Sequence, residues 1–341
     1  MKIVPEKSWK NLNTHFVKAL NSKWYKQLVE LENFINVETM KFYEELDIIT
    51  MHLPITTGSI SSPIGRGSDS SPVKVNLCGI DTYLADSMQF MLEYGCRYHT
   101  KGCYYIMPSF RGEMADERHL CQFYHSEAEI TGGLNDVMNL VEHYILHLST
   151  RLLEQKGEKL RESIGDISHI EKLVENKKFY RVTFDEAVEI LQNKFKDSID
   201  DYIEFNKGWR NITRKGEMEI MKNFDGPVWI THYDTLAVPF YQAFYKEDKN
   251  KVLNADLLMG IGETVGCGER HANLNELEYA LKIHEVDSAE YQWYMKMKEK
   301  FPLQTSGFGM GVERFLMWVL KCDDIRDLQL CPRFNGCEIV V

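Results

Sequence analysis

One short segment, Ser306–Leu320, restricts the possible folds more than any other part of the chain. Gly307, Gly309 and Gly311 alternate along its first half, and an apolar stretch follows Arg314. Because strand side chains alternate between faces, glycines at period two leave one face bare, and a flat base could lie on that backbone. Arg314 would then stand in the first turn of a helix, where free N–H groups favour anions. The alternative is a structural glycine ladder beneath a packed helix.

Residues 110–129 have the pattern of a strand, a polar loop and a second strand. Period two places four side chains on one face of the second strand, namely Phe123, His125, Glu127 and Glu129. Buried carboxylates need partners. The segment is therefore either a solvated edge strand or the floor of a site on which a ring stacks and charged groups are held. Further side chains there could donate to phosphates: Arg111, Arg118 and His119.

Two acids, Asp256 and Glu263, bracket a strand that glycines interrupt at 262, 266 and 268. Two carboxylates can hold Mg²⁺ between a protein and a polyphosphate. Glycines inside a strand often mark the close approach of a ligand or of another backbone. A magnesium site is one interpretation of this pair, and ordinary surface charge is the other.

The strand-like segments cluster without regular alternation with helices, which predicts an α+β fold with an antiparallel or mixed β-sheet flanked by helices. A capping box at Thr183–Glu186 marks the start of one helix. The Ser- and Gly-rich stretch 56–72 is expected to be a mobile loop, either a passive linker or a cover for a substrate. Expected helices cover 9–46, 134–155, 184–196, 273–284, 288–300 and the end of 306–320, expected strands cover 48–53, parts of 74–130, 228–246 and 252–268, and a solvated insertion is expected at 156–178.

Composition excludes several classes of function. No Gly-Lys dipeptide occurs, so a Walker-type phosphate loop is ruled out. The net charge of −11 argues against a protein held on nucleic acid by bulk positive charge, although a local basic groove stays possible. The N-terminus has no apolar signal region, no apolar stretch approaches about 18 residues, and the eight cysteines are too sparse for a disulfide scaffold. We therefore expect a cytoplasmic protein with no membrane partner.

Taken together, these segments resemble the catalytic core of class II aminoacyl-tRNA synthetases of the aspartyl/asparaginyl subgroup, from about residue 27 to 336. The resemblance implies that the arginine of the second motif, Arg111, contacts the α-phosphate of ATP, that Phe123 stacks on adenine and that Arg314 takes the γ-phosphate. Asp256 and Glu263 match the carboxylates that hold Mg²⁺. Arg111, Arg314 and Glu263 are then the catalytic residues, and the implied ATP site also includes Glu113, Arg118, His119, Leu120 and Gly311.

The resemblance also implies an amino-acid site. Arg270 matches the arginine that grips the substrate side chain, and the segment around Ser87 and Gln89 looks like the amino-acid-binding element, with Glu127 nearby. Aspartate enzymes carry a lysine where Leu92 stands, whereas asparagine enzymes have leucine followed by glutamate, as in Leu92-Glu93. A carboxylate at Glu93 accepts hydrogen bonds from an amide and repels an acid, which favours asparagine, although ordinary surface placement is the alternative.

The resemblance has limits that bear on function. We expect a single catalytic domain, with residues 1–26 as an N-terminal extension and no anticodon-binding domain. The helix 27–46 and Pro54 look like the first motif of the family, which implies a homodimer formed through them. The second-motif loop looks one residue short, and Gln122 stands where the family usually has glutamate. AMP-forming asparagine synthetases are similar free-standing cores. The leading hypothesis is therefore a ligase that activates asparagine or aspartate for a small amine such as ammonia; the alternatives are charging of tRNA and a non-catalytic regulatory paralogue.

Overall fold

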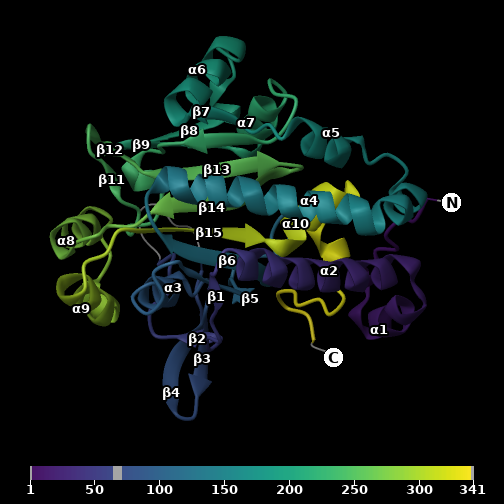
Figure 1. Cartoon of the computed structure of the whole chain (residues 1–341), viewed down its shortest axis with the longest axis horizontal. Coiled ribbons are helices and arrows are strands. Elements are labelled where there is room, and N and C mark those ends of the chain that lie inside the picture. The colour runs from purple at the N-terminus through teal and green to yellow at the C-terminus, as the bar shows by residue number, and fades with distance from the viewer. Residues whose placement is uncertain (1, 64–70, 339–341) are drawn as a thin grey trace.

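The computed structural model describes residues 2–63 and 71–338, so residues 64–70 of the predicted loop 56–72 lie outside the described residues. Its centre is a mixed eight-stranded sheet in the order β1-β5-β6-β15-β14-β13-β10-β7 (Figure 1). The two outermost pairs are parallel and the inner pairs antiparallel, which confirms the predicted α+β class. The strands are β1 (Ile49–Thr50), β5 (Cys103–Phe110), β6 (Gln122–Thr131), β15 (Thr305–Gly311), β14 (Gly262–Glu269), β13 (Asn254–Met259), β10 (Val228–Thr231) and β7 (Tyr180–Thr183).

Two long helices, α2 (Lys23–Glu45) and α4 (Leu134–Ile164), run side by side across one face of this sheet (Figure 1). The expected helix over 9–46 is interrupted: α1 (Leu12–Asn21) ends before Ser22, whose hydroxyl accepts from the backbone N–H of Trp24 and caps α2. A side-chain cap of this kind satisfies one of the free N–H groups at a helix start. The predicted strand 48–53 shrinks to the two residues of β1.

The prediction of a solvated insertion at 156–178 is wrong. Helix α4 continues to Ile164, and α5 (Ser168–Asn176) follows after a short turn. The buried side chains of both belong to the main core, including Leu160, Ile170 and Leu173. The many charged residues of this stretch occupy the outer faces, which masked the apolar stripe that drives the packing.

A second core lies beside the far edge of the sheet, around α6 (Phe184–Lys194) and α7 (Arg214–Met221). The predicted capping box is confirmed, because the hydroxyl of Thr183 accepts from the N–H of Glu186 and the Glu186 carboxylate accepts from the N–H of Thr183. Further elements of this region are β8 (Ile203–Asn206), β9 (Trp209–Ile212), β11 (Phe244–Tyr245), β12 (Asp248–Val252), α8 (Leu274–Ile283) and α9 (Gln292–Lys300).

The remaining elements lie in several parts of the molecule. A three-stranded sheet in the order β2-β4-β3 carries a hairpin that projects away from the body (Figure 1). In the described residues, no helix is both long and apolar enough to cross a membrane. These elements are β2 (Thr56–Thr57), β3 (Val73–Leu77), β4 (Ile80–Leu84), α3 (Gln89–Gly95), α10 (Val312–Leu320) and the short 3₁₀ turns Ser8–Lys10, Ile199–Asp201, Thr235–Ala237, Ser288–Tyr291 and Ile325–Leu328.

Candidate active site

The glycines of β15 lie opposite the polar face of β6. The paired residues are Gly307 with Glu129, Gly309 with Glu127 and Gly311 with His125. A Cβ at Gly307 would overlap the Glu129 carboxylate, and one at Gly309 would lie 3.0 Å from Oε1 of Glu127. At these two positions the glycines therefore make room for acids of the neighbouring strand, not for a base lying on bare backbone. The solvated-edge interpretation of β6 is wrong, because β5 and β15 flank it and Glu129 is fully buried.

A cavity of about 310 Å³ opens between β6, β15, the start of α10 and the loop that joins β5 to β6. It brings together most of the ATP site that was expected from sequence, drawn from three distant segments. The lining includes Arg111, Glu113, Arg118, His119, Leu120, Phe123, Glu263, Gly311 and Arg314. Asp256 lines the neighbouring cavity instead. The fold thus creates one pocket in which guanidinium groups, an aromatic ring and a carboxylate all meet.

Two arginines in this cavity are placed to receive anions. The guanidinium of Arg111 lies over the ring of Phe123, 5.5 Å from its centroid. Its Nε is buried and hydrogen-bonds to no described residue. Arg314 donates from Nη1 to the backbone oxygen of Glu263 at 2.6 Å and lies 3.7 Å from the Glu263 carboxylate. Each guanidinium carries five N–H donors, so both arginines can still bind an anionic group such as phosphate.

Arg118 and His119 already have partners within the protein. Nη2 of Arg118 donates to Oε2 of Glu217 at 2.9 Å, and Nδ1 of His119 lies 3.0 Å from Oδ1 of Asp116. A nucleotide would have to share these groups or displace their partners. Sequence reasoning missed Glu217, because it comes from α7, and the polar side chains of an isolated helix do not reveal which of them faces a distant loop.

The carboxylates of the two acids proposed for a metal approach the same position above Gly266. A Cβ at Gly266 would lie 3.1 Å from Oε1 of Glu263 and 3.5 Å from Oδ1 of Asp256. Burial, together with the negative charge of Glu263, raises the pKa of Asp256 well above its usual value. A divalent cation would relieve this repulsion, and carboxylate oxygens suit Mg²⁺. Within residues 2–63 and 71–338 no cluster of three metal-binding side chains occurs, so phosphate oxygens or water would have to complete the coordination.

A second cavity of about 300 Å³ lies directly beside the first. Four of the five residues expected to bind the amino acid line it, namely Ser87, Gln89, Glu127 and Arg270. Arg270 is fully enclosed and donates from Nη2 to Oε2 of Glu129 at 3.0 Å, while its guanidinium lies 5.2 Å from the ring centroid of Tyr241. Arg270 thus already has an acid of the sheet as its partner, and burial raises the pKa of that acid, Glu129, to about 7.

Glu127 is the carboxylate that faces the second cavity. It accepts from the hydroxyl of Ser87 at 2.6 Å and from that of Tyr105, and it lies 3.0 Å from Nδ1 of His125. Burial opposes its ionisation, but the contacts with His125, Ser87 and Tyr105 outweigh burial and lower the pKa of Glu127. The cavity therefore contains an ionised, tightly held carboxylate.

Glu93 does not line either cavity, which contradicts its expected contact with the substrate. Its side chain is fully buried, accepts from the hydroxyl of Tyr294 at 2.8 Å and forms an ion pair with Lys298. Both partners come from the region of α9, about 200 residues later in the chain. A buried carboxylate requires such partners, and only the fold reveals that α9 provides them. The surface alternative for Glu93 is equally wrong.

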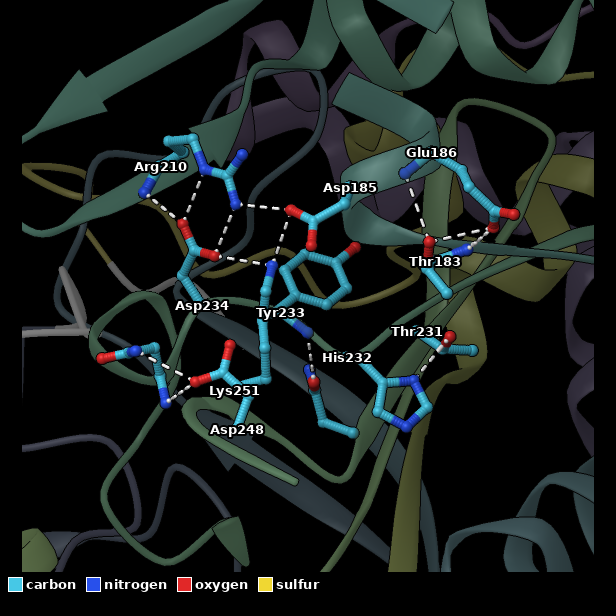
Figure 2. Close-up of polar contacts among 12 residues, drawn as sticks. Thr183, Asp185, Glu186, Arg210, Thr231, His232, Tyr233, Asp234, Asp248 and Lys251 are labelled. Atoms are coloured by element: carbon cyan, nitrogen blue, oxygen red, sulfur yellow. Dashed lines mark hydrogen bonds and ion pairs between the residues drawn. The ribbon is translucent and has the colours of Figure 1, made fainter. Parts of the chain in front are cut away.

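The segment that lines the second cavity at 237–242 follows Asp234, which belongs to an ion-pair network that sequence analysis did not detect (Figure 2). The Asp234 carboxylate accepts from Nε and Nη2 of Arg210 at 2.9 and 2.8 Å and from Nζ of Lys251 at 2.8 Å. Asp185 joins both cations from the start of α6. Burial raises the pKa of Asp234, but the two cations more than compensate and lower it. The β8–β9 hairpin thereby anchors the chain just before this segment.

Comparison with known proteins places this architecture in a family. The family model for tRNA synthetases class II (D, K and N) matches residues 9–335. The chain belongs to this family. Among curated relatives, asparagine–tRNA ligase of Pyrococcus abyssi is 32% identical over 74% of this chain and 56% of its own length. Asparagine–tRNA ligase of Thermoplasma acidophilum is 27% identical over 92% of this chain and 70% of its own length.

Solved structures of class II synthetases agree with the fold. Asparaginyl-tRNA synthetase from Pyrococcus horikoshii complexed with asparaginyl-adenylate superposes with a TM-score of 0.82 at 25% identity, over 93% of this chain and 70% of that one. The Entamoeba histolytica asparaginyl-tRNA synthetase complexed with asparaginyl-adenylate gives a TM-score of 0.79 at 24% identity, over 98% of this chain and 71% of that one. The class II core of this chain thus spans just over half of one curated relative and 70% of the other.

Proposed function

We propose that this chain is an ATP-dependent ligase that activates asparagine as an aminoacyl-adenylate and transfers the asparaginyl group to tRNA. The observation that carries the proposal is the pair of adjoining cavities, one lined by cationic and aromatic groups suited to a nucleotide and the other by polar groups suited to an amino acid. Where two such cavities adjoin, a carboxylate and an α-phosphate can be brought together without a nucleophile from the protein.

In the proposed first step, the carboxylate of the amino acid attacks the α-phosphate of ATP in line, and pyrophosphate leaves. Arg111 would bind the α-phosphate and Arg314 the γ-phosphate, so that negative charge is stabilised at both ends of the triphosphate. Phe123 would stack on the base. Asp256 and Glu263 would hold Mg²⁺, which when bound supplies further charge stabilisation on the phosphates.

Asparagine is favoured over aspartate by the charge balance of the second cavity. Arg270 is paired with Glu129, and Glu127 is ionised, so the lining arginine without a carboxylate partner among the described residues is Arg111, which the proposed first step assigns to the α-phosphate. No other arginine or lysine of the described lining is then left for a second carboxylate. The family position that carries lysine in aspartate enzymes is Leu92 here, and it lines the same cavity. An amide can donate to a carboxylate, whereas an acid would be repelled. The names of the curated relatives point the same way.

We propose tRNA, not ammonia, as the acceptor of the asparaginyl group, which is the reverse of the expectation from sequence. The relatives reported above are tRNA ligases, and none is an asparagine synthetase. A purely regulatory role is disfavoured by the geometry, because five buried or half-buried charged groups converge on the two cavities: Arg111, Asp256, Glu263, Arg270 and Arg314. Charges that serve no ligand are costly to collect in a cavity.

Pyrophosphate exchange over a panel of amino acids tests the proposal. We expect ATP–pyrophosphate exchange with asparagine at least tenfold faster than with aspartate, and AMP release that is stimulated by total tRNA but not by ammonia. Stimulation by ammonia in place of tRNA would restore the synthetase hypothesis. Absence of exchange with every standard amino acid would refute the activation chemistry altogether.

We further propose that the chain forms a homodimer through α2 and the edge strand β1, close to Pro54. The outer face of α2 exposes large apolar side chains, with Val29, Val37 and Met40 at 42%, 40% and 61% exposure, and Ile49 of β1 is 42% exposed. Apolar side chains gathered beside an open sheet edge are typical of an interface.

Met40→Glu should therefore convert the dimer to a monomer in sedimentation equilibrium, because each two-fold-related copy would bury a charge in the interface. Leu77→Glu on β3 is the matched control, since Leu77 is 51% exposed on the distant hairpin, and it should leave the mass unchanged. An unchanged mass for both variants would rule out this interface.

A further inference from the structure

Four residues line both cavities and so surround the place where nucleotide and amino acid would meet: Arg111, His125, Glu263 and Gly309. Gly309 has no side chain, and the guanidinium of Arg111 does not lose its proton. Glu263 is assigned to the metal. The imidazole of His125 is the remaining group, and a neutral imidazole has a nitrogen lone pair that can accept a proton.

The position of the His125 ring is fixed by its neighbours. Nδ1 lies 2.9 Å from Oγ of Ser109 and 3.0 Å from Oε1 of Glu127. The ring packs edge-on against Phe123 with centroids 4.7 Å apart, and the side chain is 13% exposed. An ionised carboxylate can only accept a hydrogen bond, so the contact with Glu127 favours the proton on Nδ1. The lone pair then resides on Nε2, for which no hydrogen bond to a described residue is found.

We propose that His125 is the general base of the acyl-transfer step, with Glu127 and Ser109 holding the ring and its tautomer. This inference rests on the proposed function. A ribose hydroxyl oxygen of the acceptor attacks the carbonyl carbon of the aminoacyl-adenylate, and a new ester C–O bond forms. The bond from that carbon to the phosphate oxygen breaks, and its electron pair leaves with AMP. The hydroxyl proton passes to Nε2 of His125.

The two half-reactions place different demands on such a base. In the first step the attacking group is a carboxylate, which carries no proton at neutral pH. In the second step the attacking hydroxyl must lose its proton as the ester forms. Loss of the base should therefore slow transfer and spare activation. A residue that only shapes the site should affect both steps together.

The decisive variant is His125→Asn. The asparagine amide can replace Nδ1 as a donor to Glu127 and Ser109, but it has no atom at the position of Nε2. We expect pyrophosphate exchange within about threefold of the unmodified protein, and single-turnover transfer from preformed adenylate to tRNA slowed by about 10²-fold or more. In His125→Ala, added imidazole should restore part of the transfer rate. His143→Asn, on the exposed side of α4, is the matched control and should change neither rate.

Three results would overturn the assignment. Transfer at the normal rate in His125→Asn would show that Nε2 takes no proton. Equal losses of exchange and transfer in that variant would assign His125 a structural role. Absence of exchange in the unmodified protein would refute the proposed function and, with it, the assignment of His125 as general base. Because exchange is measured first, failure of the proposed function and failure of the base are distinguishable.

Discussion

Arg111→Ala and Arg314→Ala should each reduce ATP–pyrophosphate exchange by about 10³-fold or more, the largest effects on activity that we expect for single substitutions. Each removes a guanidinium that lines the first cavity, where the triphosphate is proposed to lie. Loss of a single fixed donor to a developing oxyanion typically costs 10²- to 10³-fold in rate. Loss of a whole guanidinium facing a phosphate should reach or exceed the upper end of that range, because it removes charge as well as several donors.

A lysine variant and a surface arginine variant separate the effect of charge from the effect of geometry. Arg111→Lys keeps the positive charge but cannot bind a phosphate through two N–H groups, so it should recover only part of the lost rate. Arg181→Ala is the matched control, because Arg181 pairs with Glu142 at the far edge of the sheet. It should leave exchange unchanged. Exchange near the normal rate in Arg111→Ala or in Arg314→Ala would mean that the triphosphate lies elsewhere.

Lys298→Met should lower the free energy of unfolding by about 3–5 kcal/mol, the largest effect on stability that we expect. Lys298 is fully buried and is the charged partner of Glu93. Burial lowers the pKa of Lys298, and the Glu93 carboxylate opposes that effect. Removal of the cation leaves Glu93 as an uncompensated buried charge, with Tyr294 as its remaining donor among the described residues. Urea denaturation monitored by circular dichroism measures the change.

The double variant Glu93→Gln/Lys298→Met gives the internal control. It removes both charges, and the amide oxygen of glutamine can still accept from Tyr294. We expect it to be more stable than Lys298→Met alone, because replacing a buried ion pair costs far less than breaking one. Glu93→Gln should change the KM for asparagine by less than about threefold. A tenfold rise in that KM with unchanged stability would indicate that Glu93 contacts the substrate, as the sequence pattern predicts.

The functional segments could be predicted from sequence because each of them is local. The glycine alternation of 306–311, the strand–loop–strand of 110–129 and the spacing from Asp256 to Arg270 are visible within a few neighbouring residues. Together they led to the family and the α+β fold, both of which are confirmed. The capping box at Thr183 was predictable for the same reason, since it involves only one helical turn.

What sequence reasoning missed depends on partners that are far apart along the chain. Glu217 pairs with Arg118 across 99 residues, and Lys298 pairs with Glu93 across 205. The charges of 156–178 indicate a solvated stretch, but its apolar residues pack into the main core. Local sequence patterns do not show which distant helix covers a given carboxylate, because that contact forms only when the layers pack together.

Local sequence patterns specify the chemical types present at this site and the strands that carry them, because glycine spacing and strand period act within one segment. The role of each group depends on how distant elements pack around it. The glycines of β15 make room for the acids of β6, Glu93 pairs with Lys298 of α9, and Arg270 pairs with Glu129. The tertiary structure also leaves His125 at the junction of the two cavities. The physical reason is that a charge excluded from water must find a partner, and packing alone determines which partner is within reach.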